Sequence, residues 1–416
     1  MNLYAIIILV ALLAEYFLDL IAEYLNLKTL NYPLPEEFRE VCDEEAYRKS
    51  QAYTRARTHF GLVISTLSML ATLVFWFACG FNYVDTIVRS WQLDRLGGLG
   101  EIWTGAAYIV VIVFARALLS LPFSVYSTFV IEERFGFNKT TPATFIADTL
   151  KGLLLALVLG GPLLIGILAF FQYAGTLAWL YCWIAVTAFI LIVQFIAPTW
   201  IMPMFNKFTP LGEGELKNAI LSYAESVKFS LRDVFVMDGS KRSAKSNAFF
   251  AGFGKNKRIA LFDTLIQRHT IPELVAVLAH EIGHYKKKHI IQGMVISIAH
   301  TGVMFFLLSQ FVSRQGLFEA FYMEHTSIYA GMIFFGMLFA PLEFFLSLLL
   351  QVISRKNEFE ADRFSAETYQ QPQAMIDALT KLSVYNLSHL TPHPLYVFLN
   401  YSHPPVLERI RALSAA

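Results

Sequence analysis

The sequence predicts an all-α protein that crosses a membrane seven times and carries soluble segments between and after its spans. Composition is the first observation behind this class: of 416 residues, 56% are hydrophobic and 15% aromatic, which is more apolar than an ordinary soluble domain. The second is a series of apolar stretches of about 20 residues, the length that crosses a bilayer as a helix. The formal net charge of +1 gives no electrostatic basis for binding nucleic acid.

The apolar stretches form a group of five and a later group of two. The predicted spans are residues 3–25, 60–84, 103–121, 150–171, 176–197, 290–312 and 327–352. We expect Gly160, Gly161 and Pro162 to break the fourth span. The chain then divides into four parts: five spans in 1–197, a soluble domain in 198–289, two spans in 290–352 and a soluble tail in 353–416.

The first span carries acidic residues that a lipid-facing helix would not tolerate. Glu15, Asp19 and Glu23 recur every four residues and therefore share one helical face. Because a charge in hydrocarbon is costly, we expect this face to meet protein or water. No basic segment precedes these residues, so we do not expect a cleaved signal peptide.

Residues 270–289, TIPELVAVLAHEIGHYKKKH, predict a helix that presents two histidines on one face. Thr270 and Glu273 form a capping box at its start. The spacing H-E-x-x-H puts His280 and His284 one turn apart, where both imidazoles reach one metal ion. Two neutral imidazoles suit Zn²⁺, with a third protein ligand and a water in the remaining positions.

Glu281 lies between the two histidines, beside the expected position of that water. A carboxylate there can act as a general base that takes the proton of the water and passes it to a leaving amine. The motif therefore predicts metal-assisted hydrolysis of a peptide bond.

A third ligand should come from another helix, and residues 354–367 offer one. Glu358 and Asp362 share a helical face, so Glu358 can bind zinc while Asp362 accepts the outer N–H of a ligating histidine. The alternative is a solvated acidic face behind a membrane span. We expect no role for Glu360, which is turned about 200° from Glu358. His289 follows His284 by five residues, and we expect it to point elsewhere on the helix.

Two residues of the tail have the chemistry to stabilise the oxyanion that forms when water attacks a carbonyl. His403 precedes two prolines, and Arg409 follows six residues later. Alone, a histidine before two prolines usually marks the turn that leads into a helix. The three cysteines form no paired pattern, and we expect them to pack in the interior.

The soluble domain also has strand patterns just before the histidine helix. Residues 234–237 predict a strand, and residues 248–253 and 258–262 flank a Gly-Lys-Asn-Lys turn typical of a hairpin. A strand beside a zinc helix commonly holds an extended substrate by adding the peptide to its edge.

Loop charges predict which side of the membrane carries this domain. Basic residues crowd the first, third and fifth connections and the tail, whereas the other connections hold only Arg89, Arg95 and Arg314. By the positive-inside rule, the zinc domain faces the cytoplasm and the amino terminus lies outside.

Four stretches together resemble the integral-membrane, zinc-dependent CAAX prenyl proteases, the type I CAAX endopeptidases. They are HEIGH at 280–284, NEFEAD at 357–362, NAFFAGFGKNKRIALFDTL at 247–265 and SHPPVLERI at 402–410. The resemblance implies a seven-helix barrel around a water-filled chamber, with a zincin-like cytoplasmic domain carrying a small hairpin or sheet. It further implies one Zn²⁺ per chain on His280, His284 and Glu358, and substrate backbone held by Asn247 with Ala248.

The resemblance also implies a substrate and a location. Members of that family remove the last three residues from prenylated CAAX proteins, so the expected partners are such a protein or peptide and the lipid bilayer. We expect a multi-pass protein of the endoplasmic reticulum membrane or a bacterial inner membrane. One alternative is a quality-control protease resembling the heat-shock zinc proteases, for which we expect fewer spans. The other is a transporter or scaffold with an incidental zinc site, which would not need Glu281.

Overall fold

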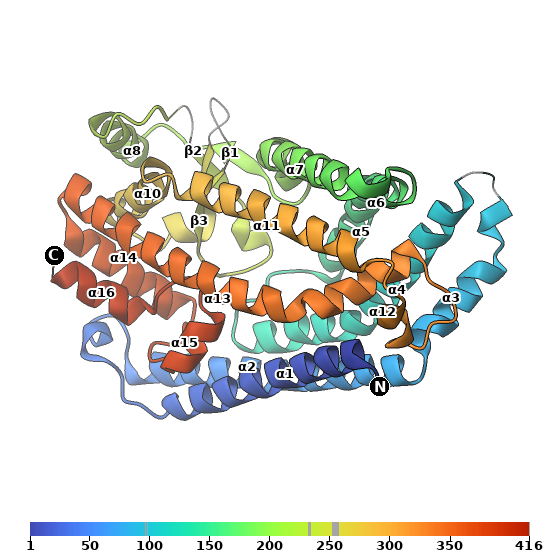
Figure 1. The fold of residues 1–416 in the computed structure, drawn as a ribbon. Helices are drawn as coiled ribbons and strands as arrows, with labels where there is room; N and C mark the ends of the chain where they lie inside the picture. The colour runs from blue at the N-terminus through green and yellow to red at the C-terminus, as the bar shows by residue number, and fades with distance from the viewer. Residues whose placement is uncertain (96, 98, 232–233, 252–257, 416) are drawn as a thin grey trace.

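Figure 1 shows the computed structural model, which describes residues 1–95, 97, 99–231, 234–251 and 258–415. The soluble helices gather at one end of the molecule, and the long apolar helices extend away from them. These soluble helices are α8 (Glu215–Ser226), α10 (Ile271–Lys286), α14 (Pro372–Tyr385) and α16 (Val406–Ser414). Within the described ranges, seven helices are long and apolar enough to cross a membrane, which agrees with the predicted number. They span Leu3–Thr29, Glu44–Phe77, Gly100–Glu132, Pro142–Tyr173, Gly175–Met204, His289–Phe311 and Ile328–Tyr369.

The second span ends earlier than predicted. Helix α2 (Glu44–Phe77) stops seven residues before the expected end at 84, because Cys79 adopts a left-handed conformation with φ of 57°. Helix α3 (Gly80–Ser90) then starts in a new direction. A Cβ at Gly80 would collide with the Phe75 ring, so the turn needs glycine here.

The expected break in the fourth span is wrong. Helix α5 (Pro142–Leu155) widens into a π-helical turn at Ala156–Gly160 and continues as α6 (Gly161–Tyr173). A proline removes one backbone donor and crowds the preceding turn, and a π turn accommodates both effects without ending the helix. Similar turns close the helices α4 (Gly100–Tyr126), at Ser127–Glu132, and α7 (Ala178–Ile196), at Ala197–Ile201.

The last two spans are α11 (His289–Phe311) and α13 (Ile328–Tyr369), joined through α12 (Gln315–Glu319). With 42 residues, α13 has a length of about 63 Å at 1.5 Å per residue, roughly twice the hydrocarbon thickness of a bilayer. One uninterrupted helix therefore joins the predicted span to the acidic stretch around Glu358.

The soluble domain contains a four-stranded sheet in the order β1-β2-β4-β3. Strand β2 (Val234–Met237) pairs in parallel with β4 (Arg258–Phe262), while β1 (Phe208–Pro210) and β3 (Ala248–Ala251) pair antiparallel at the edges. The predicted strands are confirmed where they are described, but the hairpin turn at 252–257 lies outside the described residues. Strand β1 was not predicted, because it has only three residues and ends in proline.

Helix α10 (Ile271–Lys286) is the centre of this domain. Its apolar face packs against α8 (Glu215–Ser226) and β4 through a buried cluster that includes Leu278, Ile220 and Leu261. Its other face meets α13 so closely that a Cβ at Gly283 would lie 3.2 Å from the Ala361 backbone. The glycine of HEIGH therefore lets the two helices that carry the predicted ligands come together.

The remaining helices complete the soluble end and the connections. They are α1 (Leu3–Thr29), α9 (Asp263–Ile266), α14 (Pro372–Tyr385), α15 (Pro394–Asn400) and α16 (Val406–Ser414). Helices α14 and α16 pack on each other and on α13, which brings the chain's last segment beside the histidine helix.

Candidate active site

The start of α10 is fixed by the predicted capping box. The side chain of Thr270 accepts from the helix, and the backbone N–H of Thr270 donates to Glu273 over 3.2 Å. Nζ of Lys381 in α14 also forms an ion pair with the Glu273 carboxylate over 2.6 Å, and Glu273 is almost fully buried. A buried carboxylate with both partners in place holds the helix against its neighbours.

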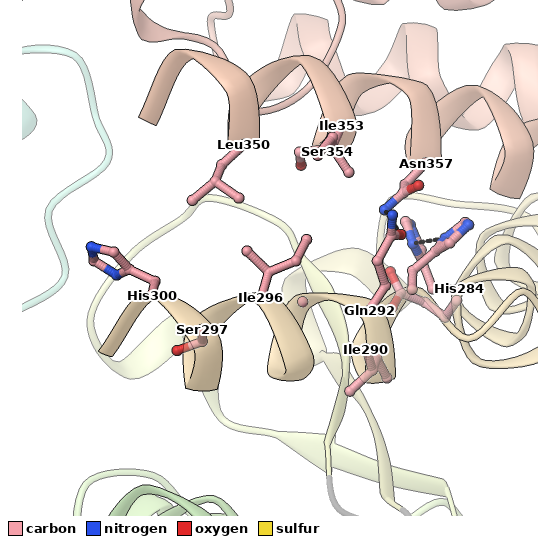
Figure 2. Close-up of a pocket in the computed structure, with 13 residues that line it drawn as sticks. His284, Ile290, Gln292, Ile296, Ser297, His300, Leu350, Ile353, Ser354 and Asn357 are labelled. Carbon is pink, nitrogen blue, oxygen red and sulfur yellow. Dashed lines mark hydrogen bonds between the residues drawn. The ribbon is translucent and has the colours of Figure 1, made fainter. Parts of the chain in front are cut away.

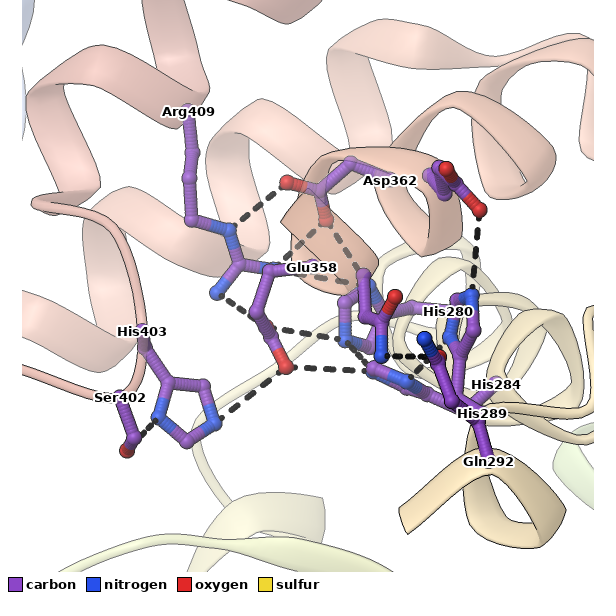
Figure 3. Close-up of polar contacts among 11 residues, drawn as sticks. His280, His284, His289, Gln292, Glu358, Asp362, Ser402, His403 and Arg409 are labelled. Atoms are coloured by element: carbon purple, nitrogen blue, oxygen red, sulfur yellow. Dashed lines mark hydrogen bonds and ion pairs between the residues drawn. The ribbon is translucent and has the colours of Figure 1, made fainter. Parts of the chain in front are cut away.

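Three side chains converge where α10 meets α13 (Figure 3). The Nε2 atoms of His280 and His284 lie 3.1 Å apart, and the Glu358 carboxylate lies 3.5 Å and 3.2 Å from them. Two ligands about 2.0–2.1 Å from a tetrahedral zinc ion are about 3.3 Å from each other. This donor set, two imidazoles and one carboxylate within 4.8 Å, therefore fits zinc.

Asp362 fixes the orientation and tautomer of His280. Its carboxylate lies 2.8 Å from Nδ1 of His280, so this nitrogen carries the hydrogen and Nε2 presents a lone pair to the cluster. Arg409 of α16 donates twice to the same carboxylate, over 2.7 Å and 2.6 Å. The site is buried, since Asp362 and Arg409 expose only 2% and 9% of their surface.

The expectation that His289 points away from the site is wrong. Lys288 adopts a left-handed conformation with φ of 63°, which turns the chain between α10 and α11 and folds His289 back. Its Nδ1 lies 3.0 Å from Nδ1 of His284, and its Nε2 lies 3.2 Å from Glu360 (Figure 3). Glu360 is turned away from Glu358 as expected, yet it reaches His284 through His289.

His403 and Arg409 both lie next to Glu358 but in different surroundings. Nε2 of His403 is 3.4 Å from the Glu358 carboxylate, and 63% of its side-chain surface is exposed. The hydroxyl of Ser402 lies 3.0 Å from its Nδ1. Arg409 is instead occupied: one terminal nitrogen lies 3.3 Å from Glu358, and the other two nitrogens donate to Asp362.

Glu281 faces a cavity of about 490 Å³ between α11 and α13 (Figure 2). Burial raises the pKa of its carboxyl, which the nearby His280 and His284 partly oppose. A carboxyl with a raised pKa is a stronger base than an exposed one, which suits a residue that must accept a proton.

Asn247 and Ala248 lie at the start of β3, the edge strand beside α10. The carbonyl of Asn247 accepts from the Phe262 N–H over 3.1 Å, and its side chain accepts from the Ala248 N–H over 2.9 Å. Among the described strands, β3 pairs only with β4, so its outer edge is open to an added peptide strand.

Two cationic side chains just before β3, Arg242 and Lys245, form contacts with the membrane helices that were not predicted. Lys245 contacts the Tyr53 hydroxyl at 2.6 Å and Glu132 at 3.0 Å, which ties this segment to the second and third spans. Arg242 forms a bidentate pair with Asp148 of α5, at 2.7 Å and 2.9 Å. The signal was present, because charged residues at the ends of spans need partners.

Two sequence profiles match successive parts of the chain. One is described as the N-terminal part of CAAX prenyl proteases, with five membrane helices, and matches residues 23–207. The other is described as peptidase family M48 and matches residues 210–416. The junction between the two matches falls at β1, in the first part of the soluble domain.

Similar proteins match over nearly the whole chain. The CAAX prenyl protease 1 homolog of Oryza sativa subsp. japonica is 38% identical over 92% of this chain and 90% of its own length. CAAX prenyl protease 1 of Saccharomyces cerevisiae is 35% identical over 91% of this chain and 88% of its own length. The crystal structure of S. mikatae Ste24p has a TM-score of 0.90 and 34% identity, and the match covers 99% of both chains. This structural match confirms the expected barrel of membrane helices with a small sheet.

Proposed function

The chain belongs to peptidase family M48 as a membrane CAAX prenyl protease and is a metalloendopeptidase; from this premise we propose that one zinc ion bound by His280, His284 and Glu358 forms its catalytic centre. The observation that carries the proposal is the convergence of these three donors from two helices. In addition, Nδ1 of His280, the nitrogen that faces away from the cluster, is already paired with Asp362. The rival heat-shock group was expected to have fewer than seven spans, and a scaffold would not need a base beside the ligands.

Glu281 acts as the general base in this mechanism. When bound, zinc supplies Lewis-acid polarisation of water and of the scissile carbonyl. The Glu281 carboxylate removes a proton from the attacking water and later donates it to the nitrogen of the leaving amine. This role is supported by the position of Glu281 at the wall of a cavity, next to the proposed ligand His284.

His403 donates a hydrogen bond to the developing oxyanion. A neutral imidazole carries one N–H, and the Ser402 hydroxyl can donate to Nδ1, which leaves the hydrogen on Nε2. That nitrogen points to the metal centre, beside Glu358. Arg409 acts as a positioning residue, because its guanidinium is committed to Asp362 and Glu358 and holds both carboxylates in place.

The substrate is the carboxyl-terminal segment of a protein whose cysteine carries a prenyl thioether. The relatives are named CAAX prenyl proteases, and the open edge of β3 offers Asn247 and Ala248 to an extended peptide. Cleavage after the prenylated cysteine releases the last three residues.

The chain is a multi-pass membrane protein, and we place its catalytic domain on the cytoplasmic side, in the endoplasmic reticulum membrane or a bacterial inner membrane. This orientation rests on the basic residues in the connections next to the soluble domain.

Incubation with a farnesylated CAAX peptide and its unprenylated twin, followed by mass spectrometry, tests the function. We expect loss of the last three residues from the farnesylated peptide, and a rate lower by several orders of magnitude for Glu281→Gln with zinc still bound. Cleavage at another bond, or a zinc-loaded Glu281→Gln variant within tenfold of wild type, contradicts the proposal.

A further inference from the structure

The cavity beside Glu281 is a groove between the two predicted spans α11 and α13 (Figure 2). Its walls come from α11, residues 289–300, and from α13, residues 350–357. Eleven residues separate the two ends of the α11 wall, which corresponds to about 16 Å along the helix axis. We call this cavity the α11–α13 groove.

The lining of the groove changes along its length. At the zinc end, Gln292 and Asn357 join the two helices through a hydrogen bond of 3.1 Å. One helical turn farther on, Ile296 faces Leu350 and Ile353 across the groove, and Ser297 and Ser354 are the polar residues of the lining there (Figure 2). A peptide thus meets polar atoms near the metal, and an attached apolar chain has hydrocarbon walls next to them.

A second contact between the helices lies at the far end of the groove. His300 lies 2.9 Å from Glu343 and stacks on Phe339, with ring centroids 6.0 Å apart. The lining of the groove thus extends from Glu281 at one end to His300 at the other.

Gly293 keeps the groove open near the zinc end. A Cβ built on it meets no atom within 4 Å, although Gly293 lines the cavity. Glycine inside a helix costs about 1 kcal/mol relative to alanine, so this position gives up helix stability and leaves space in the groove. A larger side chain here would project into that space.

The chemistry of the proposed substrate indicates which group occupies the α11–α13 groove. If the proposed cleavage is correct, the scissile carbonyl belongs to the prenylated cysteine, and the thioether sulfur is three bonds from the carbonyl carbon. The isoprenoid chain must therefore begin beside the metal, and an apolar chain left in water is unfavourable. The α11–α13 groove begins at the catalytic base, since Glu281 and His284 form its end wall.

We propose that the α11–α13 groove binds the isoprenoid chain of the substrate, with Gly293 at its opening and Ile296, Leu350 and Ile353 along the chain. This inference rests on the proposed function, because only a prenylated cysteine places a lipid at this point. The groove runs along two membrane spans whose outer faces expose apolar side chains such as Val295 and Leu349.

Filling the groove tests the proposal through substrate selectivity. Gly293→Leu should lower kcat/KM for a farnesylated peptide at least tenfold more than it lowers kcat/KM for an S-methyl peptide of the same sequence. Ile296→Trp, one turn farther on, should reduce cleavage of the farnesyl peptide more than that of a geranyl peptide. The matched control is Gly166→Leu in α6, where an added Cβ also meets no atom within 4 Å but which does not line the groove.

A labelling experiment locates the chain without relying on turnover. Zinc-loaded Glu281→Gln protein is mixed with a peptide whose farnesyl group carries a diazirine, irradiated and digested. We expect labels within residues 290–300 or 350–357. Labels confined to other helices, or an equal loss for farnesyl and S-methyl peptides in Gly293→Leu, would overturn the groove assignment. Wild-type protein that leaves the farnesylated peptide intact would instead overturn the proposed function.

Discussion

At the scale of single residues, the centre depends on how each histidine is held by a second residue. His280 donates directly to Asp362, which Arg409 supports. His284 has a longer connection: with Nε2 facing the metal site, its Nδ1–H donates to His289, whose own N–H reaches Glu360. All three carboxylates of the EFEAD stretch therefore contact a histidine of this cluster: Glu358 lies beside His280 and His284, Asp362 contacts His280, and Glu360 contacts His289.

This connection reverses the expectation for Glu360. We predict that His289→Ala and Glu360→Ala each weaken zinc binding by roughly ten- to a hundredfold, because His284 loses the group that orients it. The double variant should be no weaker than His289→Ala, since both residues act in one hydrogen-bonded series. Competition with a zinc chelator measures the affinities.

The control for that series is Glu367→Ala, an exposed carboxylate on the same helix, which should bind zinc as wild type does. Unchanged affinity in both single variants would remove His289 and Glu360 from the site. Glu358→Ala, which deletes a proposed ligand, should nearly abolish binding.

For His403 the prediction is a loss of turnover with zinc binding unchanged, in contrast to His289 and Glu360. Because it is exposed and directed at the reacting position, His403→Ala should lower kcat by about a hundredfold without changing zinc content. Ser402→Ala should produce a smaller loss of kcat, since the hydroxyl only favours one tautomer. Loss of metal in His403→Ala would show that the residue supports the ligands instead.

At the scale of elements, the close contact between α10 and α13 brings the ligands together. HEIGH lies on α10 and Glu358 on α13, and the distance between the two helices is set by Gly283 against Ala361. Interiors pack tightly, so even one added methyl group at such a contact must move a neighbour.

Gly283→Ala tests this contact. In an open helical position the change would stabilise by up to about 1 kcal/mol, but here the added Cβ should destabilise by about 1–3 kcal/mol and weaken zinc binding. Denaturant unfolding and chelator competition are the measurements. Gly166→Ala, where space is open, serves as the control, and equal stability of the two variants would rule out a packing role for Gly283.

At the scale of the whole molecule, α13 joins the membrane part to the soluble part. It is a predicted membrane span at its start and carries Glu358 and Asp362 near its end, so one continuous helix links a membrane span to the proposed catalytic centre. The groove between α11 and α13 extends from the proposed metal centre along these two predicted spans.

Cysteine labelling in intact cells tests the orientation. In a background with Cys42, Cys79 and Cys182 replaced by serine, Arg95→Cys and Arg314→Cys should react with an impermeant reagent, and Ser240→Cys should react only after lysis. Lys255 is a second labelling position that the sequence places on the cytoplasmic side, but it lies outside the described residues. Labelling of Ser240→Cys alone in intact cells would invert the topology.

The sequence by itself determined the local features of this protein. Span number, the capping box at Thr270, the histidine spacing and the shared face of Glu358 and Asp362 all follow from helix periodicity and residue chemistry, which act over a few positions. The tertiary structure decided what depends on distant segments. The return of His289 through a left-handed Lys288, the commitment of Arg409 to Asp362 and the groove beside Gly293 each arise where separate helices meet. No local pattern encodes those meetings, because they are fixed by packing between residues far apart in the chain.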